Sequence, residues 1–409
     1  MAIVKYLDDM EANIEAKDDS GHTPLFAGCC EGNFEIVKSL VTMKANIEAK
    51  NKKGDTPLLV GTQNGNFEIV KYLVNIKANI EAKGEYDHTP LLVGTQMGNF
   101  EIVKYLVNMK ANIEAKDDSD YTPLLAGCCE GNFEIVKYLV NMKANIEAKN
   151  RKGDTPLIES SHMENFEIVK YLVNIKANIE AKGEYDHTPL LVGTQMGNFE
   201  IVKYLVNMKA NIEAENCYGD TPLMYGIKVI DSRIVKYLID MKANIEAVGQ
   251  YGHTPLIMGC MKRDLKIVKS LVNMKANIEG ENKEHGDTPL IWGCSKNGYE
   301  IVKYLIDMKA NIEAENNYGC TPLIAACTNG NFRIVKYLVN MKANIEAENR
   351  NGDTPYGLTN DDEIKTFIKH DCIERRVQVF NRDLRNLYIL STELKRGLGA
   401  EMVAISSKK

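Results

Sequence analysis

Residues Asn51–Lys83 read NKKGDTPLLVGTQNGNFEIVKYLVNIKANIEAK, and this stretch predicts two short helices joined by a turn. Thr56 can accept a backbone hydrogen bond as an N-cap, while the following proline takes the first helical position, where a missing N–H costs nothing. Gly65 can adopt the left-handed conformation that ends the first helix. We expect Asn66 to cap the second helix, with Glu68 in its first turn favoured by the helix dipole.

The second predicted helix carries an apolar face, because Phe67, Val70, Leu73 and Val74 follow helical spacing. Two helices this short cannot bury that face alone. Stacking of neighbouring helix pairs about 8–10 Å apart would bury it, so we expect a core in the form of a long strip.

The Thr-Pro dipeptide of this stretch recurs throughout the chain. Successive threonines lie 33 residues apart, with a single step of 34 between Thr254 and Thr288, and all eleven prolines lie in these dipeptides. The threonines are Thr23, Thr56, Thr89, Thr122, Thr155, Thr188, Thr221, Thr254, Thr288, Thr321 and Thr354. A 33-residue period with Thr-Pro-Leu is the signature of a helical repeat array.

With these motifs the chain resembles the ankyrin-repeat family, from Met1 to about residue 373. The resemblance implies an all-α, curved ankyrin-repeat solenoid of paired antiparallel helices with protruding turns. It also implies a protein-binding scaffold that contacts its partner through the turn tips and the concave side of the first helix of each pair. The recurring segment KYLVNMKANIEAK also resembles sequences of the large ankyrin families of parasitic single-celled eukaryotes.

Four segments follow from the repeat pattern. We expect an N-terminal half repeat or cap in residues 1–17, ten full repeats in 18–348, a degenerate capping repeat in 349–373 and a basic amphipathic helical tail in 374–409. The half repeat is equally consistent with a fragment of a longer reading frame. Residues 84–115 and 183–214 are identical, which indicates duplication of a three-repeat cassette.

Composition narrows the class of protein. The 409 residues are 44% hydrophobic and 26% charged, which is typical of a folded chain, and the net charge of −6 argues against a nucleic-acid partner. No apolar run reaches the roughly 18 residues of a membrane span, and we expect no signal peptide, because the first residues lack its charged and apolar regions. The ten cysteines do not show the spacing of a disulfide framework, so we expect free thiols and a cytoplasmic or nuclear location. We expect no cofactor and no metal.

Three departures from the family pattern affect stability. A lysine follows the second helix where the family has glycine, as at Lys44 and Lys77, and would be strained in the left-handed region. Eight repeats have glycine, such as Gly61, where the family has alanine, and close helix approach would compensate. The glutamates at Glu48 and Glu81 replace a family asparagine, and we expect them to be solvated.

Three sets of residues invite a chemical interpretation. Cys29, Cys128, Cys260, Cys294 and Cys327 share one position in the first helix, where we expect a small buried residue. Histidine or aspartate precedes each of several Thr-Pro dipeptides, where we expect a variable contact surface. The fifth repeat has Glu159-Ser160-Ser161-His162, but on one helical turn these side chains point in different directions, so we expect no catalytic triad.

The candidate partner-binding residues lie at the turn tips and at the ends of the first helices. Tyrosine is favoured at binding hot spots, and a basic cluster in repeats seven to nine would dock an acidic partner segment. The candidates are Tyr86, His88, Gln96, Met97, Tyr121, His162, Met163, Tyr185, His187, Tyr218, Lys228, Tyr251, His253, Lys262, Arg263, Lys296 and Tyr318.

The tail has apolar residues on alternating three- and four-residue spacing, at Val377, Phe380, Leu384, Leu387, Leu394 and Leu398. We expect it chiefly to pack over the last repeat as a lid. A helix that binds a partner or makes a dimer contact, and one that docks on a membrane surface, are the alternatives. The chain would thus be a protein-binding scaffold, or else an adaptor or effector that recruits machinery through this helix, and not an enzyme.

Overall fold

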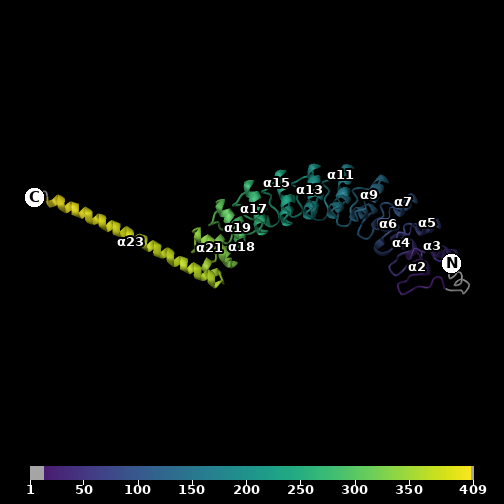
Figure 1. Ribbon diagram of the computed structural model, residues 1–409, viewed down its shortest axis with the longest axis horizontal. Helices are drawn as coiled ribbons and strands as arrows, with labels where there is room; N and C mark the ends of the chain where they lie inside the picture. The colour runs from purple at the N-terminus through teal and green to yellow at the C-terminus, as the bar shows by residue number, and fades with distance from the viewer. Residues whose placement is uncertain (1–12, 407–409) are drawn as a thin grey trace. The chain divides into compact units, whose positions relative to one another are not determined.

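The computed structural model describes residues 13–406, with side chains up to residue 393. Within that range the chain is helical, with no strand. It divides into two compact units, Met1–Ala243 and Asn244–Lys409. Figure 1 shows that each unit is built from short helix pairs that follow one another along the chain.

The first unit contains seven described helix pairs, each with a seven-residue and a nine-residue helix. The pairs are α2 (Pro24–Cys30) with α3 (Phe34–Thr42), α4 (Pro57–Gln63) with α5 (Phe67–Asn75), α6 (Pro90–Gln96) with α7 (Phe100–Asn108), α8 (Pro123–Cys129) with α9 (Phe133–Asn141), α10 (Pro156–His162) with α11 (Phe166–Asn174), α12 (Pro189–Gln195) with α13 (Phe199–Asn207), and α14 (Pro222–Lys228) with α15 (Ser232–Asp240). Short 3-10 turns, η1 (Glu85–Asp87) and η2 (Glu184–Asp186), precede two of them.

The second unit continues the pattern and ends in one long helix. Its elements are η3 (Gln250–Gly252), α16 (Pro255–Met261) with α17 (Leu265–Asn273), α18 (Pro289–Ser295) with α19 (Tyr299–Asp307), α20 (Pro322–Thr328) with α21 (Phe332–Asn340), the single turn α22 (Pro355–Leu358), and α23 (Asp362–Ser406). The predicted half repeat at 1–17 falls largely on residues 1–12, outside the described part of the chain.

The start and end of the first helix of a pair form as the sequence predicts, as α4 shows. Thr56 Oγ1 accepts a hydrogen bond from Leu59 N (3.4 Å), Pro57 takes the first helical position and Gly65 has φ +71°. A Cβ on the helical Gly28 would lie 3.3 Å from Val37 Cγ2. Close approach of the two helices therefore explains the glycine, as expected.

Asn66 does not cap its helix, which corrects the prediction. It occupies the N-cap position, but its side chain makes no capping bond. Its Nδ2 instead donates to Cys29 O of the preceding repeat (2.8 Å), and Asn132 donates to Thr95 O (2.7 Å) in the same way. These amides tie adjacent repeats together.

The glutamate row is a second inter-repeat tie, rather than only a solvated surface. Glu48 Oε1 accepts from Asn79 N (2.7 Å), and Glu81 Oε1 accepts from Asn112 N (2.8 Å). The same bond recurs in both units, for example from Asn344 N to Glu313 (2.8 Å). Each glutamate satisfies a backbone donor of the next repeat, which favours the stacked state.

The second helices add an aromatic tie. In the first unit, six of the seven second helices begin with a phenylalanine whose ring meets a tyrosine of the next repeat edge-on, with centroids 5.6–5.8 Å apart, as between Phe67 and Tyr105. This geometry adds stabilisation beyond the buried area. The second unit has the pairs Tyr299–Tyr337 and Phe332–Phe367.

The lysines after the second helices lie in the left-handed region, as predicted. Their φ angles run from +68° to +74° in all ten full repeats, from Lys44 to Lys342. A Cβ in this region is costly, by about 1–2 kcal/mol per residue. The array therefore contains one strained residue per repeat at this position.

The predicted lid is wrong. Ile364 and Ile368 near the start of α23 are buried, but Phe380 and Leu387 are 63% exposed. A single helix crosses the expected boundary at residues 373 and 374. The tail thus extends the terminal helix of the last repeat rather than folding back over it.

Candidate functional site

Five tyrosines of the predicted binding surface lie at the turn tips and are 48–61% exposed: Tyr86, Tyr185, Tyr218, Tyr251 and Tyr318. Three of them, Tyr86, Tyr185 and Tyr251, have φ between +55° and +59°. A bulky residue in the left-handed region is rare and strained, and such strain concentrates at functional positions.

Backbone hydrogen bonds hold the tips in place. Tyr86 O accepts from Asp118 N (3.1 Å), Tyr185 O from Cys217 N (2.9 Å) and, in the second unit, Tyr318 O from Arg350 N (2.9 Å). Each bond joins the tip of one repeat to the tip of the next. The exposed rings are consequently presented on a fixed backbone.

The structure brings only some of the predicted contact residues together. Tyr185 and Tyr218 stack with centroids 6.1 Å apart and an interplanar angle of 30°. Within three of the tips the tyrosine lies near the histidine two residues on: Tyr86 lies 6.0 Å from His88, Tyr185 lies 6.4 Å from His187 and Tyr251 lies 6.0 Å from His253. The tips therefore carry aromatic pairs rather than isolated rings.

At the ends of the first helices, Met97, His162 and Met163 are exposed, and Gln96 is half-buried. Met97 and Met163 are the C-cap residues of α6 and α10. Methionine is an adaptable apolar contact residue. These positions extend the exposed surface from the tips toward the helices.

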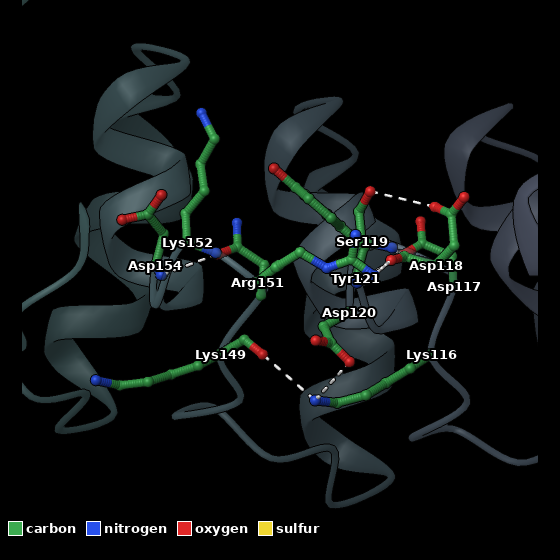
Figure 2. A network of polar contacts seen from close by, with 11 residues as sticks. Lys116, Asp117, Asp118, Ser119, Asp120, Tyr121, Lys149, Arg151, Lys152 and Asp154 are labelled. Carbon is green, nitrogen blue, oxygen red and sulfur yellow. Dashed lines mark hydrogen bonds and ion pairs between the residues drawn. The ribbon is translucent and has the colours of Figure 1, made fainter.

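Tyr121 belongs to a half-buried polar cluster rather than to the free surface. Its hydroxyl donates to Glu159 Oε1 (2.5 Å), which also accepts from Asn150 Nδ2 (2.6 Å). We call Tyr121, Asn150 and Glu159 the first box. Figure 2 shows Tyr121 among the tip residues of its own repeat, with Arg151 of the next repeat reaching across to the Asp118 carbonyl.

Burial raises the pKa of Glu159, because nearly the whole side chain is removed from water and its two hydrogen-bond donors are neutral. Burial also raises the pKa of Tyr121, and the hydrogen bond to Glu159 adds to that shift. Ser160 and Ser161 donate to the carbonyls of Pro156 and Leu157 in their own helix (2.6 and 2.8 Å). The serines therefore do not face His162 as a nucleophile would.

The same three positions, two repeats on, form a second box of His187, Asn216 and Tyr225. His187 Nε2 lies 2.9 Å from Tyr225 Oη, which accepts from Asn216 Nδ2 (3.0 Å). Burial lowers the pKa of His187. Lys228 donates to the buried Asp220 (2.6 Å) and lies 4.7 Å from the Tyr225 ring, so its charge is compensated within the repeat.

In the second unit, His253, Asn282 and Trp292 form a third box. The His253 and Trp292 rings meet edge-on at 5.5 Å, and Asn282 Oδ1 accepts from Asp287 N (2.7 Å). Two buried donors of this box, Asn282 Nδ2 and Trp292 Nε1, have no hydrogen-bond partner among the described residues. The third box thus lacks the acceptor that Glu159 and Tyr225 supply in the other two.

His88 shows how surroundings change an identical tip. Its Nε2 lies 3.6 Å from the buried carboxylate of Asp117, whereas His187 of the duplicated cassette meets Asn216 and Tyr225 instead. Both histidines are half-buried, which corrects their expected place at an exposed turn.

The predicted basic cluster loses Lys228 to its ion pair but keeps three exposed members in the second unit: Lys262, Arg263 and Lys296. Lys296 lies over the Trp292 ring at 5.5 Å. Arg263 lines a surface groove of about 490 Å³ together with Tyr299, Glu300 and Arg333. The groove is thus lined by two arginines, Arg263 and Arg333, and one carboxylate, that of Glu300.

A family model described as ankyrin repeats (3 copies) matches overlapping segments that together cover residues 1–358. The chain belongs to the ankyrin-repeat family. No curated protein matches the sequence closely enough to be a relative. Ankyrin repeats are in general protein–protein interaction modules.

Two further findings concern the ankyrin array as a whole. No helix among residues 13–406 is long and apolar enough to cross a membrane. All ten cysteines lie in the described region and are free thiols, and burial raises the pKa of Cys29 and Cys128 to about 12. A thiol with so high a pKa is a poor nucleophile at neutral pH.

Sequence reasoning missed the three boxes, although a signal was present. The fourth residue after the repeat threonine is aliphatic in most ankyrin repeats of this chain, such as Val60 and Val93, but is Glu159, Tyr225 or Trp292 in three. A polar or aromatic residue at an otherwise aliphatic position indicates a local partner.

Proposed function

We propose that this ankyrin array binds a protein partner through the tip surface, defined in the first unit by Tyr86, Tyr185 and Tyr218 with Met97 and Met163. The observation that carries the proposal is the set of exposed tyrosines held on a hydrogen-bonded backbone, two of these three in the left-handed region. Because the rings are exposed, packing within the chain does not offset the cost of this backbone strain. Binding is the function that would retain them.

Tyrosine suits this role physically. Its large amphipathic ring has only two side-chain torsions, so little conformational entropy is lost when a partner covers it. The backbone bonds from Asp118 and Cys217 fix the tips before binding, which further reduces the entropic cost of association. The exposed methionines beside them offer apolar contact that adapts to the partner.

The second unit supports a partner with an acidic segment. Three basic side chains there are exposed, those of Lys262, Arg263 and Lys296. None of them makes an ion pair with another described residue. Such charges chiefly raise the rate of association with an oppositely charged partner. Reversing them in the variant K262E/R263E should slow association and flatten its dependence on salt; unchanged kinetics would exclude the acidic segment.

The ten free thiols favour a reducing compartment, the cytoplasm or nucleus. An adaptor role, in which a further molecule is recruited through α23, is the second candidate function. The exposed apolar face of that helix favours it.

The test compares two variants that both keep the fold. In the tip variant, Tyr86→Asn and Tyr185→Asn remove the rings while tolerating the left-handed backbone, and Tyr218→Ser removes the third. The control variant changes exposed lysines on the second helices, Lys71→Gln and Lys104→Gln.

The measurement is quantitative affinity capture followed by a binding isotherm with each captured protein. The proposal expects the tip variant to lose at least about 100-fold in affinity, since hot-spot truncations cost about 2 kcal/mol or more each. The control should bind like the wild type. Equal binding by the tip variant and the wild type would refute the proposal.

A further inference from the structure

Side-chain contacts join the base of helix α23 to the last repeat. The Arg375 guanidinium donates to Val339 O (3.0 Å) and Ala343 O (3.2 Å) at the end of α21, and its Nε lies 2.6 Å from Asp371 Oδ2. The buried Ile364 and Ile368 anchor the preceding turns. The helix continues without glycine or proline to residue 396.

Beyond that anchor, five apolar side chains that are 48–63% exposed form one face, which we call the seam: Ile373, Val377, Phe380, Leu384 and Leu387. Their spacing alternates between four and three residues, the period of a helix that packs against another helix. Residues 377–393 extend about 25 Å along the helix axis. The helix does not turn this face back onto its own last repeat, so the face is open to a partner helix.

We propose that the seam pairs with the seam of a second copy of this chain, as an antiparallel two-helix coiled coil. In the register that places Val377 opposite Phe380 of the second copy, Ile373 lies opposite Leu384, and both layers repeat by two-fold symmetry. Apolar residues then face apolar residues through the middle of the seam.

Charge complementarity supports this arrangement. Arg376 and Asp383 lie seven residues apart on the same flank of the seam, and the antiparallel register brings Arg376 of each copy beside Asp383 of the other. Arg376 is exposed, and among the described residues its guanidinium donates only to the exposed Glu346 (3.0 Å), which leaves donors for a second carboxylate. Residues 374–393 hold four arginines against three acidic residues, so two copies repel little.

A groove at the root of the helix supports the same register. It has a volume of about 710 Å³ and is lined in part by Ile345, Tyr356, Ile368 and Lys369. The register places Leu387 and Leu390 of the second copy alongside residues 367–370, next to this groove. Leu390 is 55% exposed in the single chain, and the groove would cover it.

Self-association has a functional consequence. A dimer carries two copies of the tip surface, so a partner with two sites would bind with avidity and no new contact. The dimer itself does not rest on the proposed partner binding, because its mass is measured on the purified full-length chain alone.

The experiment is light scattering of the full-length chain over a concentration series. We expect a dimer. Leu384→Asp would bury two unpaired carboxylates per dimer and should raise the dissociation constant at least about 100-fold. Ile389→Asp is the matched control: Ile389 has nearly the same exposure (46% against 48%) but lies off the seam, and this variant should remain dimeric.

The orientation is tested by charge exchange. Asp383→Arg would place arginine beside Arg376 of the other copy twice and should weaken the dimer, whereas D383R/R376D should restore it. In a parallel pair these two positions do not meet, so the second change would not rescue the first.

Several outcomes would overturn the proposal. A wild-type chain that is monomeric throughout would exclude self-association, and monomeric chain that sediments with anionic phospholipid vesicles would favour a membrane-surface helix instead. Loss of the dimer in both Leu384→Asp and Ile389→Asp, or failure of D383R/R376D to recover, would exclude the seam or its orientation. Circular dichroism of each variant establishes that the helices remain formed.

Discussion

The left-handed lysines after the second helices allow a quantitative test of how much backbone strain lowers the stability of the array. Lys110, Lys143 and Lys176 have φ of 72–73° and exposed side chains. A left-handed residue with a Cβ costs about 1–2 kcal/mol, while glycine loses roughly 0.5–1 kcal/mol more chain entropy on folding. The net gain from Lys→Gly is therefore about 0.5–1 kcal/mol at each site.

The three sites lie in successive repeats, roughly 10 Å apart, so their effects should add. The variant K110G/K143G/K176G should gain about 1.5–3 kcal/mol in free energy of unfolding. The assay is urea denaturation followed by circular dichroism. Amide exchange adds a local measurement at Ala111 and Ala144, whose N–H groups bond to Leu106 O and Leu139 O (both 3.0 Å) across the strained residues.

The control is Lys104→Gly, at an exposed position with ordinary helical geometry inside α7. It should lose about 1 kcal/mol, because glycine in a helix interior is unfavourable. If the triple variant were no more stable than the wild type while the control lost stability as expected, the left-handed lysines would not be a source of strain, and the reasoning would be refuted.

Three other predictions concern titration, the second box and the thiols. Burial raises the pKa of Glu159 above its usual 4.5, so the folded state binds this proton more tightly than the unfolded state, and the stability contributed by Glu159 should fall as pH rises from 4.5 through the folded pKa. Urea midpoints measured over a pH series should show this fall in the wild type and not in Glu159→Gln. Parallel curves of midpoint against pH for the two proteins would contradict the prediction. Tyr225→Phe should cost about 1–2 kcal/mol, because the buried Asn216 amide and the His187 ring lose the hydroxyl that both contact; an unchanged urea midpoint would contradict the box. Iodoacetamide with mass spectrometry should label the exposed Cys30 long before the buried Cys260, and equal labelling rates would show that the array opens readily.

The helix pairs could be predicted because their signals are local. Threonine, proline and glycine act on their own turn, and the apolar face of each second helix is visible within nine residues, so Thr56, Gly65 and Leu73 behave as expected. The strain at Lys44 could be predicted for the same reason, since it depends only on the backbone of one residue.

The inter-repeat ties could not be predicted from one repeat. Asn66 has two ways to satisfy its amide, and the choice depends on a carbonyl 37 residues away. The sequence of a single repeat predicts a solvated Glu48, and the next repeat supplies the Asn79 donor. The lid at the C-terminus failed as a prediction because the amphipathic pattern shows that a face needs covering but does not show by what.

The candidate site was predictable in its exposed part only. The tip tyrosines Tyr86 and Tyr185 are where the resemblance placed them. Tyr121, His187 and Lys228 are also candidates, but Tyr121 and His187 each find a partner in the next repeat and Lys228 finds one in its own repeat, so all three are drawn into the structure.

The most direct test of partner binding through the tips is hydrogen–deuterium exchange of the array with and without a captured partner. Protection is expected at residues 84–88, 183–187 and 217–219, with the exposed faces of the second helices around Lys71 and Lys104 unchanged. Protection confined to the second helices or to α23, with the tips exchanging as in the free chain, would contradict the account.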